Sequence, residues 1–387
     1  MKHRPRPGVE IESPEELDRR VAAGATSLAG WQLQDLDLRG RREVLARVDP
    51  RGALFLGGRF DPGVEDDLRA RGALLFPTVP DVPVDVYRSG LYSPGELYDG
   101  LATGGYQETL DARAYAWAIS SGEDLRRLLA QSLHDLSIDD ALAELVRGRR
   151  LVGVMGGHAT ARGSAVYRDA ARLGHSLSRA GLTVATGGGP GAMEAANLGA
   201  YLAGHEQEAL TEACDRLASV PEFRPSVTAW ARAAFDVRRR WPASRTSLDT
   251  SPGTSPGTSL GTSLGVPTWF YGHEPPNAFA EQVAKYFKNA IREDVLLHVC
   301  SAGIVFLPGS AGTVQEVFQD ACENYYAEPS TVAPMVLVGA DHWTRELPVW
   351  PLLRALADRS PMRERVHLVD DPEEAVRLLD VRSAAAG

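Results

Sequence analysis

The chain has 387 residues, of which 44% are hydrophobic and 24% charged, as in a globular enzyme with room for two domains. Its formal net charge of −10 argues against a nucleic-acid-binding protein, because such proteins usually carry an excess of Lys and Arg. Three cysteines without metal-ligand spacing predict a reducing, cytoplasmic location and no metal site. No apolar run approaches the roughly 18–20 residues that span a bilayer, and the basic first residues lack the apolar core of a secretory signal.

Residues 1–148 predict a small mixed α/β domain of unknown role. Residues 52–58 and 73–77 are short apolar runs typical of strands, and residues 64–72 between them are typical of a helix that ends at a glycine. A longer helix is predicted over residues 125–146. Because "GRR" follows this helix, we expect a domain boundary after residue 148.

From residue 149 to residue 387 the pattern of strand, glycine turn and helix repeats. Apolar runs predict strands at residues 151–155, 182–186, 303–308, 334–339 and 366–370, and helices are predicted between them, for example over 165–181 and 312–326. This alternation predicts a doubly wound, Rossmann-like parallel sheet with helices on both faces. Ligands of such sheets bind beyond the C-terminal ends of the strands.

Residues 244–266 interrupt this pattern with a four-residue repeat, T-S-L/P-G/D. The repeat is polar and rich in Gly and Pro, so it cannot bury a core. We predict a flexible surface insertion without chemistry of its own.

The stretch "TGGGPGAME", residues 186–194, is the first candidate binding turn. A strand leads directly into Gly187, Gly188 and Gly189, and Gly191 precedes a helix. Glycines allow backbone N–H groups to approach an anion, and a helix N-terminus favours negative charge. The alternative is a tight turn that needs positive φ. Neither a Walker loop nor a clean G-x-G-x-x-G pattern is present.

The stretch "LPGSAGTVQE", residues 307–316, is the second candidate. It too joins a strand to a helix, and the hydroxyls of Ser310 and Thr313 add donors that suit a phosphate. The alternative is a capping box, with Thr313 as N-cap and Glu316 reaching back to it. Two matching turns in one sheet nevertheless indicate two ends of one ligand, such as a nucleotide. A third glycine turn, "GGHATARG", begins with Gly156 and Gly157.

Residues 269–298 provide the candidate basic side chain. A helix is predicted from residue 278, with one apolar stripe and with Arg292 on another face. Arg292 either reaches the ligand, since its guanidinium fits phosphate and ribose oxygens, or belongs to a solvated charged face. Before this helix, His273, Glu274 and Asn277 either line a pocket or cap the helix.

"GGGPGAMEAAN" and "PGSAGTVQE" together resemble the motifs of the Lonely Guy family, over about residues 150–380, and the extra N-terminal domain resembles a larger bacterial subgroup. The resemblance implies a Rossmann-like fold, a homodimer or higher homo-oligomer, and hydrolysis of the N-glycosidic bond of nucleoside 5′-monophosphates. It implies that Glu316 is catalytic, with Arg292 the nearest candidate for the family's catalytic arginine, although Glu293 rather than Lys follows it. Gly309, Gly312 and Thr313 match the phosphate-binding positions, and Ser310 replaces a glycine there.

The prediction is therefore a phosphoribohydrolase that releases free base and ribose 5-phosphate from an AMP-like substrate, without a cofactor. The base or ribose is expected at Gly187, Gly188, Gly189, Gly191 and Met193, with Gly156 and Gly157 nearby. One alternative is a non-catalytic nucleotide- or cofactor-binding regulator on the same fold. Another is a single-stranded DNA-binding protein, against which the acidic charge weighs.

Overall fold

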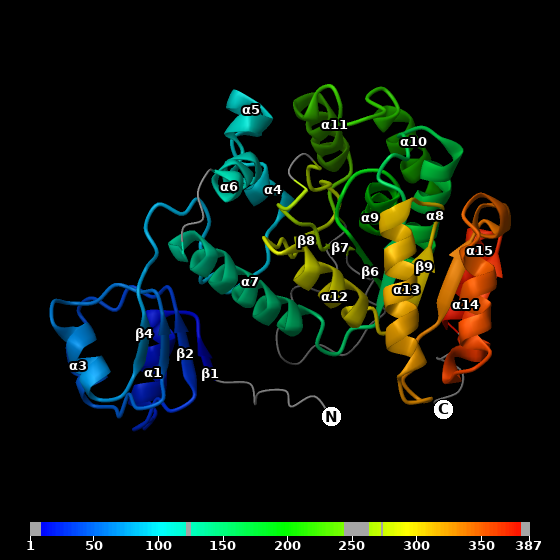
Figure 1. The fold of residues 1–387 in the computed structure, drawn as a ribbon. Helices are drawn as coiled ribbons and strands as arrows, with labels where there is room; N and C mark the ends of the chain where they lie inside the picture. The colour runs from blue at the N-terminus through cyan, green and yellow to red at the C-terminus, as the bar shows by residue number, and fades with distance from the viewer. Residues whose placement is uncertain (1–8, 121–124, 244–262, 272–273, 381–387) are drawn as a thin grey trace. The chain divides into compact units, whose positions relative to one another are not determined.

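The computed structural model describes residues 9–120, 125–243, 263–271 and 274–380, and it contains two compact units (Figure 1). The smaller unit consists of Met1–Gly90 and Ser120–Ala141, and the larger of Leu91–Ile119 and Leu142–Gly387. Residues 91–119 thus belong to the larger unit. The predicted domain division at residue 148 stays a prediction.

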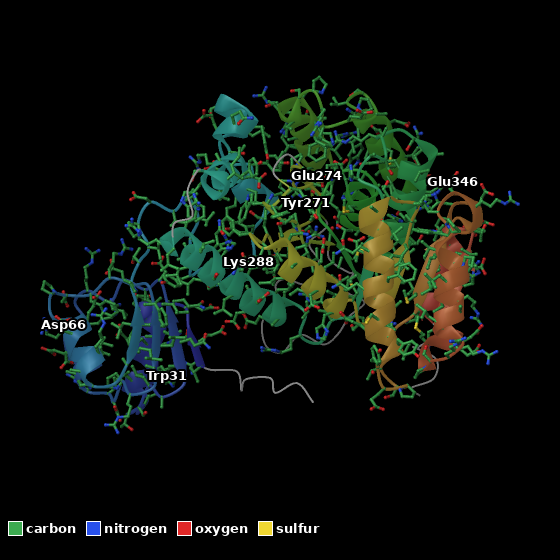
Figure 2. The ribbon with its side chains drawn as sticks, in the orientation of Figure 1. Trp31, Asp66, Tyr271, Glu274, Lys288 and Glu346 are labelled. Atoms are coloured by element: carbon green, nitrogen blue, oxygen red, sulfur yellow. The ribbon has the colours of Figure 1, made fainter. Side chains whose placement is uncertain are left out.

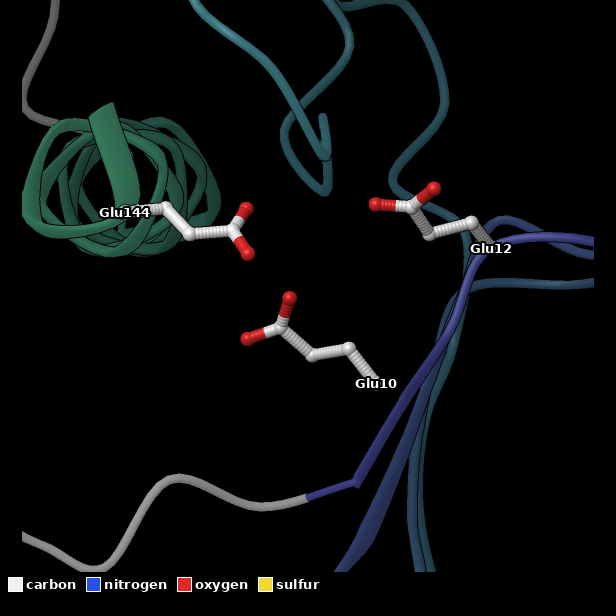
Figure 3. A group of neighbouring side chains, drawn as sticks. All are labelled: Glu10, Glu12 and Glu144. Atoms are coloured by element: carbon white, nitrogen blue, oxygen red, sulfur yellow. The ribbon is translucent and has the colours of Figure 1, made fainter. Parts of the chain in front are cut away.

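Over the described residues, the smaller unit has a four-stranded parallel sheet in the order β1-β2-β3-β4. Alternation places Ile11, Leu33 and Phe55 in its core, and the neighbouring positions point to the other face. Glu10 and Glu12, two residues apart, point to the same side of the strand, as Figure 3 shows. Its elements are β1 (Val9–Ile11), α1 (Pro14–Ala22), β2 (Trp31–Gln34), α2 (Arg42–Ala46), β3 (Leu54–Leu56), α3 (Val64–Ala70) and β4 (Leu74–Phe76). The strand–helix–strand unit predicted over residues 52–77 is confirmed as β3, α3 and β4.

The larger unit has, within the described ranges, a seven-stranded parallel sheet in the order β11-β10-β9-β5-β6-β7-β8. The chain runs outward from β5 to β8 and then returns to β9 on the other side of β5. Because crossovers between parallel strands are almost always right-handed, these two opposite directions place helices on opposite faces, in agreement with the doubly wound, Rossmann-like prediction. The strands are β5 (Leu151–Met155), β6 (Thr183–Thr186), β7 (Ser263–Gly265), β8 (Gln282–Val283), β9 (Gly303–Phe306), β10 (Met335–Val338) and β11 (Val366–Val369).

The order reverses between β5 and β9, so the switch point lies at their C-terminal ends. Strands β5, β6, β9 and β10 are buried along their whole length, as expected for central parallel strands. The helices of the larger unit are α4 (Pro94–Leu97), α5 (Leu101–Gly104), η1 (Tyr106–Glu108), α6 (Leu110–Ile119), α8 (Ala165–Arg179), α9 (Ala192–Tyr201), α10 (Gln207–Leu217), α11 (Val227–Arg240), α12 (Asn289–Val299), α13 (Ala311–Tyr325), η2 (His342–Glu346), α14 (Val349–Ala357), η3 (Pro361–Arg365) and α15 (Pro372–Asp380). Most of α7 (Leu125–Leu145) belongs to the smaller unit.

A buried polar cluster attaches residues 91–119 to the rest of the larger unit. Lys285 Nζ lies 2.5 Å from Asp111 Oδ1, and both side chains are almost fully buried. Trp269 Nε1 donates to the same carboxylate at 2.8 Å, and Tyr106 Oη donates to its other oxygen at 2.7 Å. The carboxylate is therefore fully satisfied, which a buried charge requires.

Two predictions about residues 244–298 need correction. The helix predicted from residue 278 begins only at Asn289, and the residues before it form β8 and irregular chain. Ala278, Ala284 and Tyr286 are all buried, so this segment has no exposed face and its periodicity was misleading.

Of the predicted flexible insertion, residues 244–262 lie outside the described residues. Ser263–Gly265, at its end, form the buried strand β7 between β6 and β8. In the part of the chain that the structure describes, no helix is both long and apolar enough to cross a membrane.

Candidate active site

The three predicted glycine turns meet at the switch point. The amide of Gly157, after β5, donates to Pro308 O at 3.2 Å, and its carbonyl accepts from Ala192 N at 3.1 Å. A β-carbon at Gly156 would lie 3.0 Å from Ala192 Cβ and 3.1 Å from Leu307 Cβ, so a side chain there would displace its neighbours. The loops after β5, β6 and β9 are therefore in direct contact.

The turn after β6 has the backbone that its glycines predict. Gly188 and Gly191 have φ of +70° and +76°, a region that L-residues with a side chain rarely adopt. Asn277 supports this turn: its backbone N–H donates to Gly188 O at 2.8 Å, and its Nδ2 donates to Gly189 O at 3.2 Å. Asn277 thus fixes the turn, whereas the sequence left a choice between lining a pocket and capping a helix.

A buried amide and hydroxyl lie beneath the same turn. Thr186 Oγ1 accepts from Gly188 N at 2.9 Å and donates to Asn197 Oδ1 at 2.7 Å. Asn277 Nδ2 also donates to Asn197 Oδ1, at 2.9 Å. These bonds link α9 and the segment before β8, so the turn is held from two sides.

The loop after β9 does not form the capping box. Helix α13 begins at Ala311, and Ser310 occupies the N-cap position. The Ser310 side chain makes no capping hydrogen bond to this helix within the described residues. Thr313 lies inside the first turn and is buried against Gly309, where a β-carbon would collide with Thr313 Oγ1. Ser310 and Gly312 are exposed. The first amides of α13 are therefore open to an anion from outside.

Arg292, on α12, faces the turn after β6. Its side chain is only 9% exposed, and within the described residues its Nε has no hydrogen-bond partner. A β-carbon at Gly187 would lie 3.5 Å from Arg292 Nη1 and 2.8 Å from Met193 Sδ. The interpretation of Arg292 as part of a solvated face is therefore wrong, because the side chain is buried and its guanidinium lies near Gly187.

Glu316 lies on α13, one helical turn after Gly312 and Thr313. The pKa of its carboxyl is raised to about 7. Burial is the largest cause of the increase; the positive charge of Arg292 acts against it, and the negative charge of Glu293 adds to it. These effects require Arg292 and Glu316 to lie near each other. The site thus has a carboxyl group with a pKa near neutral pH, on which the charge of Arg292 acts, beside an uncapped helix N-terminus.

His342 is a residue that sequence reasoning missed. Its Nε2 lies 3.3 Å from Gly309 N and 3.1 Å from Gly309 O, and its Nδ1 lies 2.8 Å from a carboxylate oxygen of Glu346, which is labelled in Figure 2. It follows β10, the neighbour of β9 in the sheet. Its position just after the apolar run "PMVLVG" was the available signal, since polar residues at strand ends gather at one edge.

Comparison with known proteins identifies one segment. Residues 149–206 match the family model LDcluster4, described as the SLOG cluster4 family. This segment contains the loops after β5 and β6 and helix α9. No curated protein matches the chain significantly in sequence.

Solved structures that match include two molybdenum cofactor proteins. One is the molybdenum cofactor binding protein from the phototrophic bacterium Rippkaea orientalis, with 15% identity over 61% of this chain and 97% of that chain, and a TM-score of 0.36. The other is the molybdenum cofactor carrier protein from Chlamydomonas reinhardtii, with 16% identity over 61% of this chain and 99% of that chain, and a TM-score of 0.36. Nothing about this chain's ligand follows from scores this low.

The predicted homo-oligomer stays a prediction. The matched range, residues 149–206, contains β5, β6 and the two glycine turns that follow these strands. Residues 149–206 match the SLOG cluster4 family, and the SLOG name includes that of the Lonely Guy proteins, in agreement with the predicted resemblance.

Proposed function

We propose that the chain binds a nucleoside 5′-monophosphate at the switch point and hydrolyses its N-glycosidic bond to free base and ribose 5-phosphate. The observation that carries this proposal is Arg292, a buried guanidinium with an unpaired Nε that faces a glycine turn beside Glu316. A buried cation without a full set of partners is unfavourable unless a ligand with oxygen acceptors completes it.

The 5′-phosphate would lie on Gly309, Ser310, Gly312 and Thr313. The exposed loop, its uncapped helix and the positive end of the α13 dipole support an anion there. His342 would hold this loop through Gly309. The turn from Gly187 to Gly191 and Met193, next to Gly156 and Gly157, would hold the ribose and the base.

In the reaction, cleavage of the N-glycosidic bond develops positive charge on the ribose ring. The ionised carboxylate of Glu316 would stabilise this charge or orient the attacking water, and Arg292 would hold phosphate or ribose oxygens. The water supplies hydroxide to C1′ and a proton to the departing base. No residue needs to form a covalent intermediate in this scheme.

The test is incubation of the purified protein with a panel of nucleoside 5′-monophosphates and the matching nucleosides, followed by chromatography for free base. We expect release from monophosphates only, because the nucleosides lack the group that the α13 loop binds. Glu316→Gln should reduce turnover by about 10²–10⁴-fold while nucleotide binding persists.

Glu323→Gln is the matched control, because it makes the same change on the same helix at a more exposed position. It should keep wild-type turnover. Wild-type turnover by Glu316→Gln would disprove the catalytic assignment. Nucleotide binding by calorimetry without release of any base would favour the non-catalytic binding protein instead.

A further inference from the structure

A cavity of about 280 Å³ lies beside the glycine turn after β6. Its walls come from the loop after β5, from Pro190 and Gly191, from the loop between α10 and α11, and from Glu274 before β8. Its volume is near the lower end for small-molecule pockets, which suits one ring system rather than a whole nucleotide. None of its residues belongs to the α13 loop that is proposed to hold the phosphate.

A buried ion pair forms one wall of this cavity. Arg162 binds Glu194 with both arms of its fork, at 2.9 Å for Nε and 2.5 Å for Nη2, and the two side chains are 3% and 0% exposed. Arg162 also donates to Trp230 O at 3.1 Å. Because four of its five N–H donors are used, the fourth by Val220 O at 3.4 Å, and its charge is balanced, Arg162 is not available to clamp a phosphate.

The other charged groups of the cavity favour a ligand that donates hydrogen bonds. Besides the Arg162–Glu194 pair, the lining contains two carboxylates, Glu222 and Glu274, one guanidinium, Arg224, and the imidazole of His158, whose Nδ1 lies 3.8 Å from Glu274 Oε1. An anion would therefore meet one more negative than positive charge. Carboxylates accept from N–H groups, and the N–H edge of a nucleobase is such a partner.

Two aromatic side chains, Phe223 and Trp230, line the cavity. Phe223 is half-buried and packs edge-on against Trp230, with ring centroids 6.5 Å apart, and the Arg162 guanidinium stacks on Trp230 at 4.5 Å. A half-buried ring beside a cavity suits stacking with a planar heterocycle.

The cavity and the proposed active site lie against the same glycine turn. A β-carbon at Gly189 would lie 3.7 Å from Glu274 Oε2, and one at Gly187, two residues earlier, would lie 3.5 Å from Arg292 Nη1. Glu274, labelled in Figure 2, and Arg292 thus face the same short turn. A ligand that lies along this turn would meet the carboxylate of Glu274 at Gly189 and the guanidinium of Arg292 at Gly187.

We infer that this cavity holds the base of the nucleotide and selects guanine, which stacks on Phe223 and donates its N1–H and 2-amino group to the carboxylate of Glu274. The inference rests on the proposed nucleotide site and names its substrate. Glu274 is chosen over Glu222 because it is less exposed and lies against the turn that connects to Arg292. Hypoxanthine has the N1–H but lacks the 2-amino group, so it distinguishes this contact from stacking alone.

The test compares guanosine 5′-monophosphate (GMP) with inosine 5′-monophosphate (IMP) by calorimetry. Binding is measured on Glu316→Gln, so that the result does not depend on turnover. We expect GMP to bind about 10- to 100-fold more tightly than IMP, the range for one hydrogen bond to a charged group. Adding Glu274→Gln should reduce this ratio to near one, mainly by weakening GMP.

Two further variants assign the contacts. Phe223→Ala should weaken GMP and IMP alike, by about 5- to 150-fold, and leave their ratio unchanged, because both bases stack. Glu222→Gln, the same change at the more exposed carboxylate, should leave the ratio unchanged too. Equal binding of GMP and IMP, or a ratio that Glu222→Gln abolishes and Glu274→Gln does not, would overturn the inference.

Turnover separates this inference from the proposed function. If base is released from all monophosphates at similar rates and GMP has no advantage in binding, the hydrolase stands and the guanine pocket fails. If GMP binds selectively but no base is released from it by the wild-type protein, the pocket stands and the hydrolase fails.

Discussion

Glu316 combines two conditions that a working carboxylate needs. It lies in the first turns of α13 next to an exposed loop, and burial raises its pKa to about 7, within the range in which enzymes act. Two neighbours on α12 act on it in opposite directions, because the positive charge of Arg292 stabilises the ionised form and the negative charge of Glu293 disfavours it. The pH dependence of turnover therefore reports on this small group of charges.

The proposed role of Glu316 requires the ionised carboxylate. As pH rises through a pKa of about 7, the ionised fraction increases, so kcat/KM should rise and then level off. Glu293→Gln removes a charge that raises this pKa, and the rising limb should move to lower pH. The measurement is the pH profile of kcat/KM for base release.

Asp294→Asn is the matched control for this shift. Asp294 follows Glu293 on α12, is exposed, and is not among the groups that shift the pKa of Glu316. Its profile should coincide with that of the wild type. If Glu293→Gln leaves the rising limb of the pH profile in place, or moves it to higher pH, another group controls turnover.

Most of the candidate site residues come from local patterns. Gly187, Ser310 and Glu316 each follow an apolar strand within a few residues, so a short window of sequence contains the whole signal. His342 and the Arg162–Glu194 pair were not predicted. Their contacts depend on which strands are neighbours in the sheet, and spacing along the chain does not determine this.

At the scale of elements, α8 and α9 meet backbone to backbone. A β-carbon at Gly174 of α8 would collide with Ala196 O, and one at Gly199 of α9 would collide with Ala171 O. The two helices can approach this closely only because each has a glycine at the crossing. Since α9 starts at the turn after β6, this contact also determines where Gly187 to Gly191 lie.

We therefore expect Gly174→Ala to lower the free energy of unfolding by about 1–3 kcal/mol, the usual range for overpacking. Elsewhere in a helix the same change normally stabilises, because alanine loses less chain entropy than glycine on folding. Gly95→Ala in α4 is the control, since the nearest atom to its β-carbon would be Ser93 Oγ at 3.8 Å. The measurement is the urea midpoint of the larger unit, and an unchanged midpoint would contradict the expected clash.

Elements with a clear period were predicted well, and elements buried on all sides were not. Helix α8 and strands β9 and β10 lie within a few residues of their predicted bounds. Strands β7 and β8 were predicted as loop and helix. Both are short strands at one side of the sheet, and their residues Leu264 and Val283 are buried. Such segments have neither the alternation of a half-buried strand nor the stripe of a surface helix.

At the scale of the whole molecule, each unit has its own hydrophobic core. In the smaller unit the core surrounds Leu33 and Phe55, and in the larger unit it surrounds Val184 and Val305. Neither of these two cores includes residues of the other unit. Cores that share no residues can unfold in separate transitions, so a single unfolding midpoint is not expected for this chain.

Scanning calorimetry should therefore resolve two transitions, and two matched variants should assign them. Trp31 is buried in the smaller unit and Trp343 in the larger. Removal of a buried tryptophan costs about 3–5 kcal/mol, so Trp31→Ala should lower one transition and Trp343→Ala the other.

A nucleoside 5′-monophosphate should raise only the transition that Trp343→Ala lowers. All residues of the proposed site lie in the larger unit, and a ligand stabilises only the unit that binds it. At a ligand concentration of 100 times Kd, this stabilisation is about 2.7 kcal/mol. The nucleoside without its phosphate should shift the transition much less, since it lacks the group that the α13 loop binds.

A single transition lowered by both variants would mean that the two cores unfold as one cooperative unit. A nucleotide that raises the Trp31-dependent transition instead would place the binding site in the smaller unit and contradict the site at the switch point.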